Sequence, residues 1–192
     1  MTLYGLPFEH RRWSVWGNAE DIARFNPLRR VPVLVLDDGE VLIESGAILD
    51  GLDDFVGESR ALLPRGGARR RDGLRVVSLA TGLADKCVSL LYEEVLRPRP
   101  LRSESWSERC RKQIRETLAA LESDRSERPT LWWLGNHLTH ADIAVACALR
   151  FLREAHEELY RTVACPALEE HGARSEAHPA FRAIHQPIVN QI

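Results

Sequence analysis

The sequence predicts a small α/β domain followed by an all-α domain. Residues 1–56 mix short strand-like apolar runs with short helical patterns, whereas long patterns of helical spacing fill the chain from about residue 69. Between the two parts, Pro64 and the pair Gly66 and Gly67 are typical of a linker. We therefore expect a first domain over residues 1–57, a linker over 58–68 and a helical domain over 69–192.

The first part contains four candidate strands and two candidate helices. The continuous apolar run from Val33 to Leu36 is typical of a strand covered on both faces, and Asp38 followed by Gly39 predicts a hairpin. Asn18 is a preferred residue for the start of a helix. The expected elements are strands over 2–4, 8–13, 33–36 and 41–43, and helices from Asn18 to before Asn26 and from Ser45 to about Phe55.

The second part is predicted to be helical throughout. Residues 74–91 carry apolar side chains at helical spacing. Ser105 and Glu108 have the spacing of a capping box that would open a second helix. Thr139 and Asp142 have the same spacing, and we interpret both as structural residues that start an apolar helix. A last short helix is expected after Pro179.

Composition excludes several classes of function. The chain has 192 residues and a net charge of −2, so its charge does not favour nucleic acid or an anionic membrane. We expect no signal peptide, because no apolar segment follows the first residues, and no membrane helix, because no run approaches ~20 apolar residues. The four cysteines are far apart and predict reduced thiols rather than a metal site. The run Arg69 to Arg71 is interpreted as a solvated helix start.

The segment from Asn26 to Ser45 carries the most chemical information. A cis bond between Val31 and Pro32 would turn the Val31 backbone outward, and X–Pro bonds adopt the cis form at modest cost. A strand then ends at Glu44 and a helix begins at Ser45. The N-terminus of a helix offers N–H groups to a carboxylate, and Glu44 can accept from an ammonium group. The segment thus suits the γ-glutamyl end of a peptide, which carries both groups.

A simpler interpretation exists for each of these residues. Ser45 could serve only as a helix cap, and Glu44 could be an ordinary surface acid. The ligand hypothesis is favoured when the two are taken together with the placement of Pro32.

The string from Asn26 to Ser45 resembles the glutathione-binding core of the cytosolic, bacterial-type glutathione transferases, and the Thr139 box resembles the capping motif of their helical domain. The resemblance implies a thioredoxin-like first domain, glutathione as a substrate without a metal, a cytoplasmic location and a homodimer that joins the first domain of one chain to the second domain of the other. It implies conjugation of glutathione to small hydrophobic electrophiles, as in detoxification, or a related thiol reaction. The alternative is a non-catalytic glutathione-binding or regulatory protein on the same fold.

The same resemblance implies roles for individual residues. Val31 and Pro32 would pair with the cysteinyl backbone of glutathione, Glu44 and Ser45 would hold its γ-glutamyl group, and Arg30 would approach its glycine carboxylate. Tyr92 would lie in the hydrophobic-substrate pocket, although a half-buried helix aromatic is an equally good interpretation.

The sequence departs from the family pattern after Tyr4. The family has a loop and a helix between its first two strands, and that loop carries the catalytic Ser, Tyr or Cys. Here only Gly5, Leu6 and Pro7 separate the two candidate strands, although a parallel crossover needs about 10–12 residues. The first helix is therefore expected to be missing, the catalytic residue is unknown, and neither Tyr4 nor Ser14 is assigned that role. We expect two parallel strands with a chain break near Gly5, or otherwise a first strand that is displaced or paired as an antiparallel hairpin.

Overall fold

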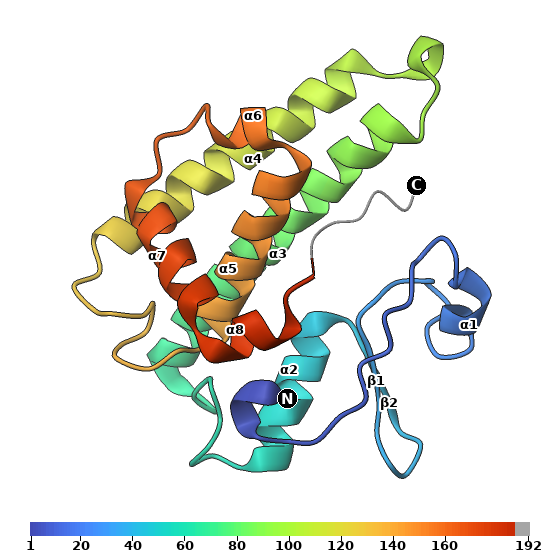
Figure 1. Cartoon of the computed structure of the whole chain (residues 1–192). Coiled ribbons are helices and arrows are strands. Elements are labelled where there is room, and N and C mark those ends of the chain that lie inside the picture. Colours follow the sequence, from blue (N-terminus) through green and yellow to red (C-terminus); the bar gives the residue numbers. More distant parts are fainter. Residues whose placement is uncertain (187–192) are drawn as a thin grey trace. The chain divides into compact units, whose positions relative to one another are not determined.

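The computed structural model describes residues 1–186, which divide into two compact units (Figure 1). The first unit spans Met1–Arg65 and the second begins at Gly66. Among the described residues, none of the helices has the length and apolar character needed to cross a membrane.

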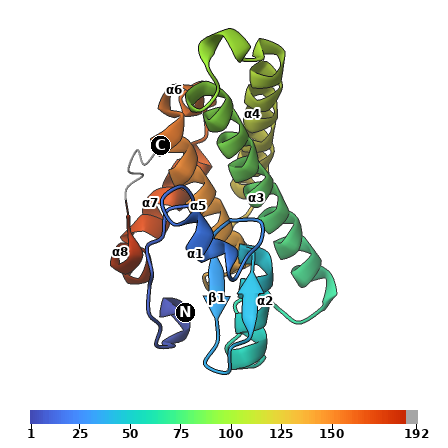
Figure 2. The same cartoon turned by 90° about the vertical axis from the view of Figure 1, so that its right-hand side faces the viewer.

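The first unit is built around one β-hairpin and one helix (Figure 2). Strand β1 (Val33–Val35) pairs antiparallel with β2 (Val41–Ile43), with Leu34 opposite Leu42. The predicted turn is present: Gly39 has a φ of 91°, which favours glycine, and the Leu36 N–H donates to the Glu40 carbonyl at 2.9 Å. The remaining elements are the 3₁₀ turn η1 (Thr2–Tyr4), α1 (Ala19–Ala23) and α2 (Ser45–Val56).

The prediction of two parallel strands at the start of the chain is wrong. Thr2–Tyr4 forms the 3₁₀ turn η1, and residues 8–13 have no regular structure. The expected break near Gly5 is also absent, because the Gly5 N–H donates to the Thr2 carbonyl and the Leu6 N–H to the Met1 carbonyl. The short connection explains the result, since three residues cannot return the chain for a parallel pairing. The first segment is therefore displaced from the sheet.

One face of the hairpin is partly uncovered. The run from Val33 to Leu36 is expected to be buried on both faces, but its Val35 is 45% exposed. Val41, the partner of Val35 on β2, is 37% exposed. The other face packs on α2, where a Cβ added at Gly51 would lie 2.8 Å from Leu42 Cδ1. This unit has a small core, in which Tyr4, Ile48 and Leu52 form one buried cluster, and Ile22 and Leu63 are buried as well.

The second unit is a helical bundle with a much larger core. Its longest helices are α3 (Gly67–Val95), α4 (Glu104–Ser126) and α5 (His140–Ala155). The shorter elements are η2 (Arg99–Leu101), α6 (Glu157–Tyr160), α7 (Pro166–Ala177) and α8 (Pro179–Ile184). The apolar positions at helical spacing in α3 face the core, and Val76, Ala80, Leu83, Cys87 and Leu90 are all buried.

The capping box predicted at Ser105 is wrong. Helix α4 begins two residues earlier, with Ser103 as its N-cap, and the Ser103 hydroxyl accepts from the Trp106 N–H at 3.3 Å. Ser105 already lies in the first turn of the helix, so its side chain cannot serve as the cap.

Candidate functional site

The junction between β2 and α2 presents the start of a helix. Glu44 is the N-cap residue, and its φ of 65° is an uncommon conformation for a residue other than glycine. The first intrahelical bond runs from the Ile48 N–H to the Glu44 carbonyl at 3.0 Å. The N–H groups of the first turn, which begins at Ser45, have no carbonyl ahead of them in the helix. They carry positive partial charge that favours a carboxylate.

Ser45 does not cap this helix. It is the first residue of α2, and the N-cap Glu44 makes no side-chain capping bond. Within residues 1–186, no hydrogen bond of the Ser45 hydroxyl is found, and the side chain is half-buried. The hydroxyl is thus not needed to hold the helix and is available to another group.

The carboxylate of Glu44 is only partly engaged. Its Oε2 lies 3.4 Å from Arg30 Nη2, in a half-exposed ion pair. Its Oε1 is buried, and no hydrogen-bond partner for it exists in the described part of the chain. A buried carboxylate oxygen without a donor is costly, so this atom is a ready acceptor for an ammonium or N–H group.

The loop before β1 brings Arg30 and Val31 to the same junction. The Val31–Pro32 peptide bond is cis, and Val31 is 49% exposed. Asn26 holds the loop from below: it is fully buried, its amide Nδ2 donates to the Arg30 carbonyl at 3.0 Å, and its Oδ1 accepts from the Leu28 N–H at 3.0 Å. The pairing of Val33 with Ile43 sets this loop beside Glu44.

The two hydroxyls nearest in sequence to the family's catalytic position are used locally. The buried Tyr4 hydroxyl donates to Asp53 Oδ1 at 2.6 Å, and burial together with this bond raises the pKa of Tyr4 far above its ordinary value. The Ser14 hydroxyl accepts from the N–H groups of Trp16 and Gly17 at 3.2 and 3.3 Å. Both geometries are those of structural side chains.

Tyr92 lies near the C-terminal end of α3 in the second unit. Its side chain is 38% exposed and lines a shallow hollow together with Leu96 and Trp106. Glu93 and Arg97 form an ion pair of 2.9 Å in the wall of this hollow.

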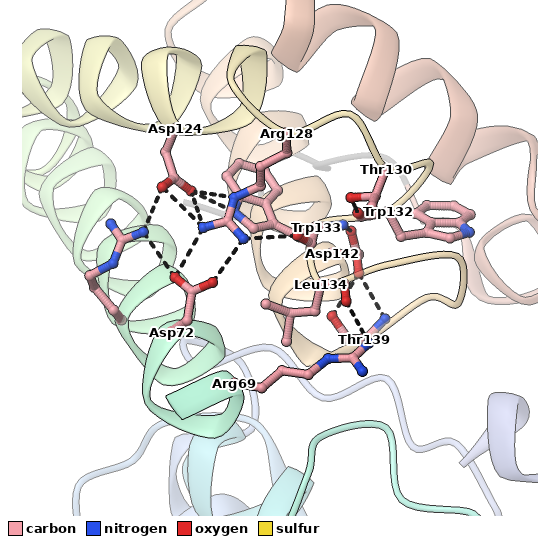
Figure 3. Close-up of polar contacts among 11 residues, drawn as sticks. Arg69, Asp72, Asp124, Arg128, Thr130, Trp132, Trp133, Leu134, Thr139 and Asp142 are labelled. Atoms are coloured by element: carbon pink, nitrogen blue, oxygen red, sulfur yellow. Dashed lines mark hydrogen bonds and ion pairs between the residues drawn. The ribbon is translucent and has the colours of Figure 1, made fainter. Parts of the chain in front are cut away.

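Thr139 and Asp142 form a complete capping box at the start of α5 (Figure 3). Asp142 is fully buried, and its Oδ2 accepts from the Thr139 N–H at 2.8 Å and the Thr139 hydroxyl at 2.7 Å. Its Oδ1 accepts from the Trp133 N–H at 2.7 Å, which ties the loop before α5 to the helix. These contacts are structural, as the spacing of the two residues indicates.

A second polar cluster holds the same loop from the other side (Figure 3). Arg128 forms ion pairs with Asp72 and Asp124 at 2.8 and 3.0 Å, and it also donates to the Trp133 carbonyl at 2.9 Å. The indole Nε1 of Trp133 donates to Asp124 Oδ2 at 2.7 Å. Among the described residues, no group of three or more His, Cys, Asp or Glu side chains could hold a metal ion.

Comparison with known proteins identifies the family. The family model for the N-terminal domain of glutathione S-transferases matches residues 1–54, and the model for their C-terminal domain matches residues 104–186. A glutathione S-transferase from Methylobacterium radiotolerans, solved with glutathione sulfonate, has a TM-score of 0.87 and 30% identity over 100% of this chain and 90% of its own. The chain belongs to the glutathione S-transferase family.

Two further relatives agree with this assignment. A glutathione transferase family member from Pseudomonas fluorescens Pf-5, solved with bound glutathione, has 34% identity and a TM-score of 0.81 over 95% of this chain and 86% of its own. The uncharacterized GST-like protein YibF of Escherichia coli K12 is 29% identical over 148 residues, which are 77% of this chain and 71% of that protein. The predicted fold class, a thioredoxin-like domain followed by a helical domain, is thereby confirmed.

In this member of the glutathione S-transferase family, the sequence patterns do not reveal the structural roles of two buried polar residues of the first domain. Asn26 opens the string that resembles the glutathione-binding core, but its role in fixing the loop that carries Arg30 and Val31 appears only in the structure. Asp53 accepts hydrogen bonds from Tyr4, which precedes α2 in the sequence, and from Leu62 and Leu63, which follow it. No pattern of neighbouring residues predicts this role.

Proposed function

We propose that this protein binds glutathione at the junction of β2 and α2 and conjugates it, through its thiol sulfur, to small electrophiles or uses it in a related thiol reaction. The observation that carries the proposal is the buried Glu44 Oε1, which has no partner in the described residues and lies at the start of a helix. Glu44 would accept from the γ-glutamyl ammonium group, and the helix start with the Ser45 hydroxyl would bind its carboxylate. Val31 and Pro32 would meet the cysteinyl backbone, and Arg30 would approach the glycine carboxylate. The relatives solved with glutathione or its sulfonate support this ligand.

The chemistry of transfer requires the thiolate of glutathione. A protein promotes it by lowering the pKa of the bound thiol, so that the thiolate attacks an electrophilic carbon and displaces a leaving group. The residue for this step is not assigned. The aromatic side chains of the hollow at Tyr92 suit a hydrophobic electrophile. We propose detoxification in the cytoplasm as the setting of the reaction.

Replacing Glu44 or Ser45 with alanine is expected to weaken glutathione binding. Each change removes an acceptor or donor for a charged group, which costs about 1–3 kcal/mol and corresponds to roughly 5- to 150-fold in Kd. Isothermal titration calorimetry with glutathione measures the effect, and circular dichroism verifies that the helical unit stays folded. Glu40→Ala, at an exposed acid of the same hairpin, is the matched control. Unchanged affinity in both Glu44→Ala and Ser45→Ala would contradict the site.

A non-catalytic glutathione-binding protein is the second candidate. The engagement of the Tyr4 and Ser14 hydroxyls in local bonds favours it. Turnover of an aryl halide with glutathione, measured beside retention on immobilised glutathione, separates the two candidates. Retention without turnover supports the second, and turnover lost in Glu44→Ala supports the first.

We also propose that the chain forms a homodimer that joins the first domain of one chain to the second domain of the other. A hollow between α3 and α4 supports a close approach of another chain, because small residues such as Gly82, Thr117 and Ala120 line part of it. Sedimentation at micromolar concentration is expected to give twice the mass of one chain. A single species at the chain mass would exclude this dimer.

A further inference from the structure

Strand β1 has one edge that no other strand uses within residues 1–186. The described sheet has two strands, and β1 pairs only with β2. The Leu36 N–H donates to the Glu40 carbonyl, so Leu36 and Glu40 form a hydrogen-bonded pair of the antiparallel ladder. Hydrogen-bonded and non-hydrogen-bonded pairs alternate along an antiparallel ladder. Leu34, two residues from Leu36, therefore directs its N–H and C=O to β2. Val33 and Val35 direct theirs to the other edge.

The neighbourhood of this edge is apolar and exposed. Val31 is 49% exposed and Val35 is 45% exposed. Residues 8–12, which the family pattern would place in the sheet, are exposed and make no backbone hydrogen bond to β1. An edge with outward N–H and C=O groups is a template for another strand.

The charges that flank β1 suit an antiparallel partner of the same sequence. Arg29 and Arg30 precede the strand, each in a half-exposed ion pair of its own chain, with Glu20 and Glu44. Asp37 and Asp38 follow the strand. If two copies pair antiparallel about Leu34, the basic end of each meets the acidic end of the other, whereas a parallel pair would set like charges together. The same arrangement sets Val33 of one copy opposite Val35 of the other, and each such pair exchanges two backbone hydrogen bonds.

We propose that β1 pairs antiparallel with β1 of a second copy of this chain, about a twofold axis at Leu34, to form a continuous β2–β1–β1–β2 sheet. Such a contact is self-complementary, as a twofold interface must be. It also brings the half-exposed valines into cross-strand pairs, which stabilise a sheet. The strand is short, so the association is weak and depends on concentration. It uses a different surface from the helical hollow, and together the two contacts would link dimers into larger assemblies.

Proline at position 35 tests the pairing without disturbing the hairpin. The Val35 N–H points away from β2, so its loss leaves the β1–β2 ladder intact but removes a donor from each half of the proposed contact. Val41→Pro is the matched control, because Val41 has the equivalent position on the outer edge of β2. We expect Val35→Pro to weaken association by about tenfold or more in sedimentation equilibrium, since two hydrogen bonds are lost per pair. Val41→Pro should associate like the natural chain.

The charge pattern gives a second, independent test. Arg29→Glu and Asp37→Lys should each reduce self-association, because each sets like charges across the strand pair, and an equimolar mixture of the two variants should restore it. Amide hydrogen exchange of Val33 and Val35 should slow as protein concentration rises. Unaltered association in Val35→Pro would overturn the proposal. So would protection of these amides that is independent of concentration, because the edge would then be covered within one chain.

Discussion

Replacing Asp142 with alanine should lower the free energy of unfolding of the helical unit by about 3–5 kcal/mol, well above the ~1 kcal/mol typical of a lost helix cap. The spacing of Thr139 and Asp142 predicts only the cap. The structure adds the Trp133 N–H as a further donor to the same fully buried carboxylate. The alanine variant would leave the N–H groups of Thr139 and Trp133 buried without acceptors, and each costs about 1–3 kcal/mol.

Urea denaturation followed by circular dichroism measures this loss. Glu104→Ala, which removes an exposed acid from the first turn of α4, is the control and should change stability by less than about 0.5 kcal/mol. A loss below about 1 kcal/mol in Asp142→Ala would show that the three contacts are not coupled in the way the geometry indicates.

The second large effect is expected at Asp53. This residue is 2% exposed, and it accepts from the Tyr4 hydroxyl at 2.6 Å and from the N–H groups of Leu62 and Leu63 at 2.8 and 3.2 Å. It thus joins η1, α2 and the segment after α2. Removing it leaves three donors without their acceptor, which costs at least about 3 kcal/mol. A unit of this size has only about 3–10 kcal/mol of stability, so Asp53→Ala should unfold most of the first unit.

Asp54→Ala separates this effect from a general loss of charge. Asp54 is the adjacent acid, its side chain is 76% exposed, and its ion pair with Arg65 at 2.8 Å lies at the surface. Such a pair contributes less than about 1 kcal/mol. Limited proteolysis should cut Asp53→Ala within the first 65 residues while the helical unit resists, and Asp54→Ala should behave like the natural chain. Equal resistance of the two variants would contradict the role given to Asp53.

Local patterns in the sequence predicted the parts of the fold that depend on neighbouring residues. The hairpin at Asp38 and Gly39, the helix after Glu44, the apolar face of α3 and the capping box at Thr139 all follow from spacing within a few residues. The capping box predicted at Ser105 is wrong because the neighbouring residues are ambiguous. A serine two residues earlier competes for the same helix start, and spacing alone does not decide between them.

The parts that the sequence could not predict depend on contacts between distant residues. Tyr4 meets Asp53 across 49 positions, and Arg128 meets Asp72 across 56. The candidate site falls between these cases. The positions of Glu44 and Ser45 follow from the motif, whereas the lone Oε1 of Glu44 and the support of Arg30 by Asn26 appear only in the folded chain.

The small core of the first unit has a consequence for ligand-linked folding. Its buried cluster consists of Tyr4, Ile48 and Leu52 with partly buried neighbours, and Ile22 and Leu63 are buried as well. So few buried side chains contribute little hydrophobic free energy to the folded state. A ligand that binds only the folded form adds about 2.7 kcal/mol of stability at a concentration 100 times its Kd. That increment is a large share of what such a unit possesses. Occupancy of the junction at Glu44 would therefore set the fraction of chains whose first unit is folded, and the ligand would act as a structural component as well as a reactant.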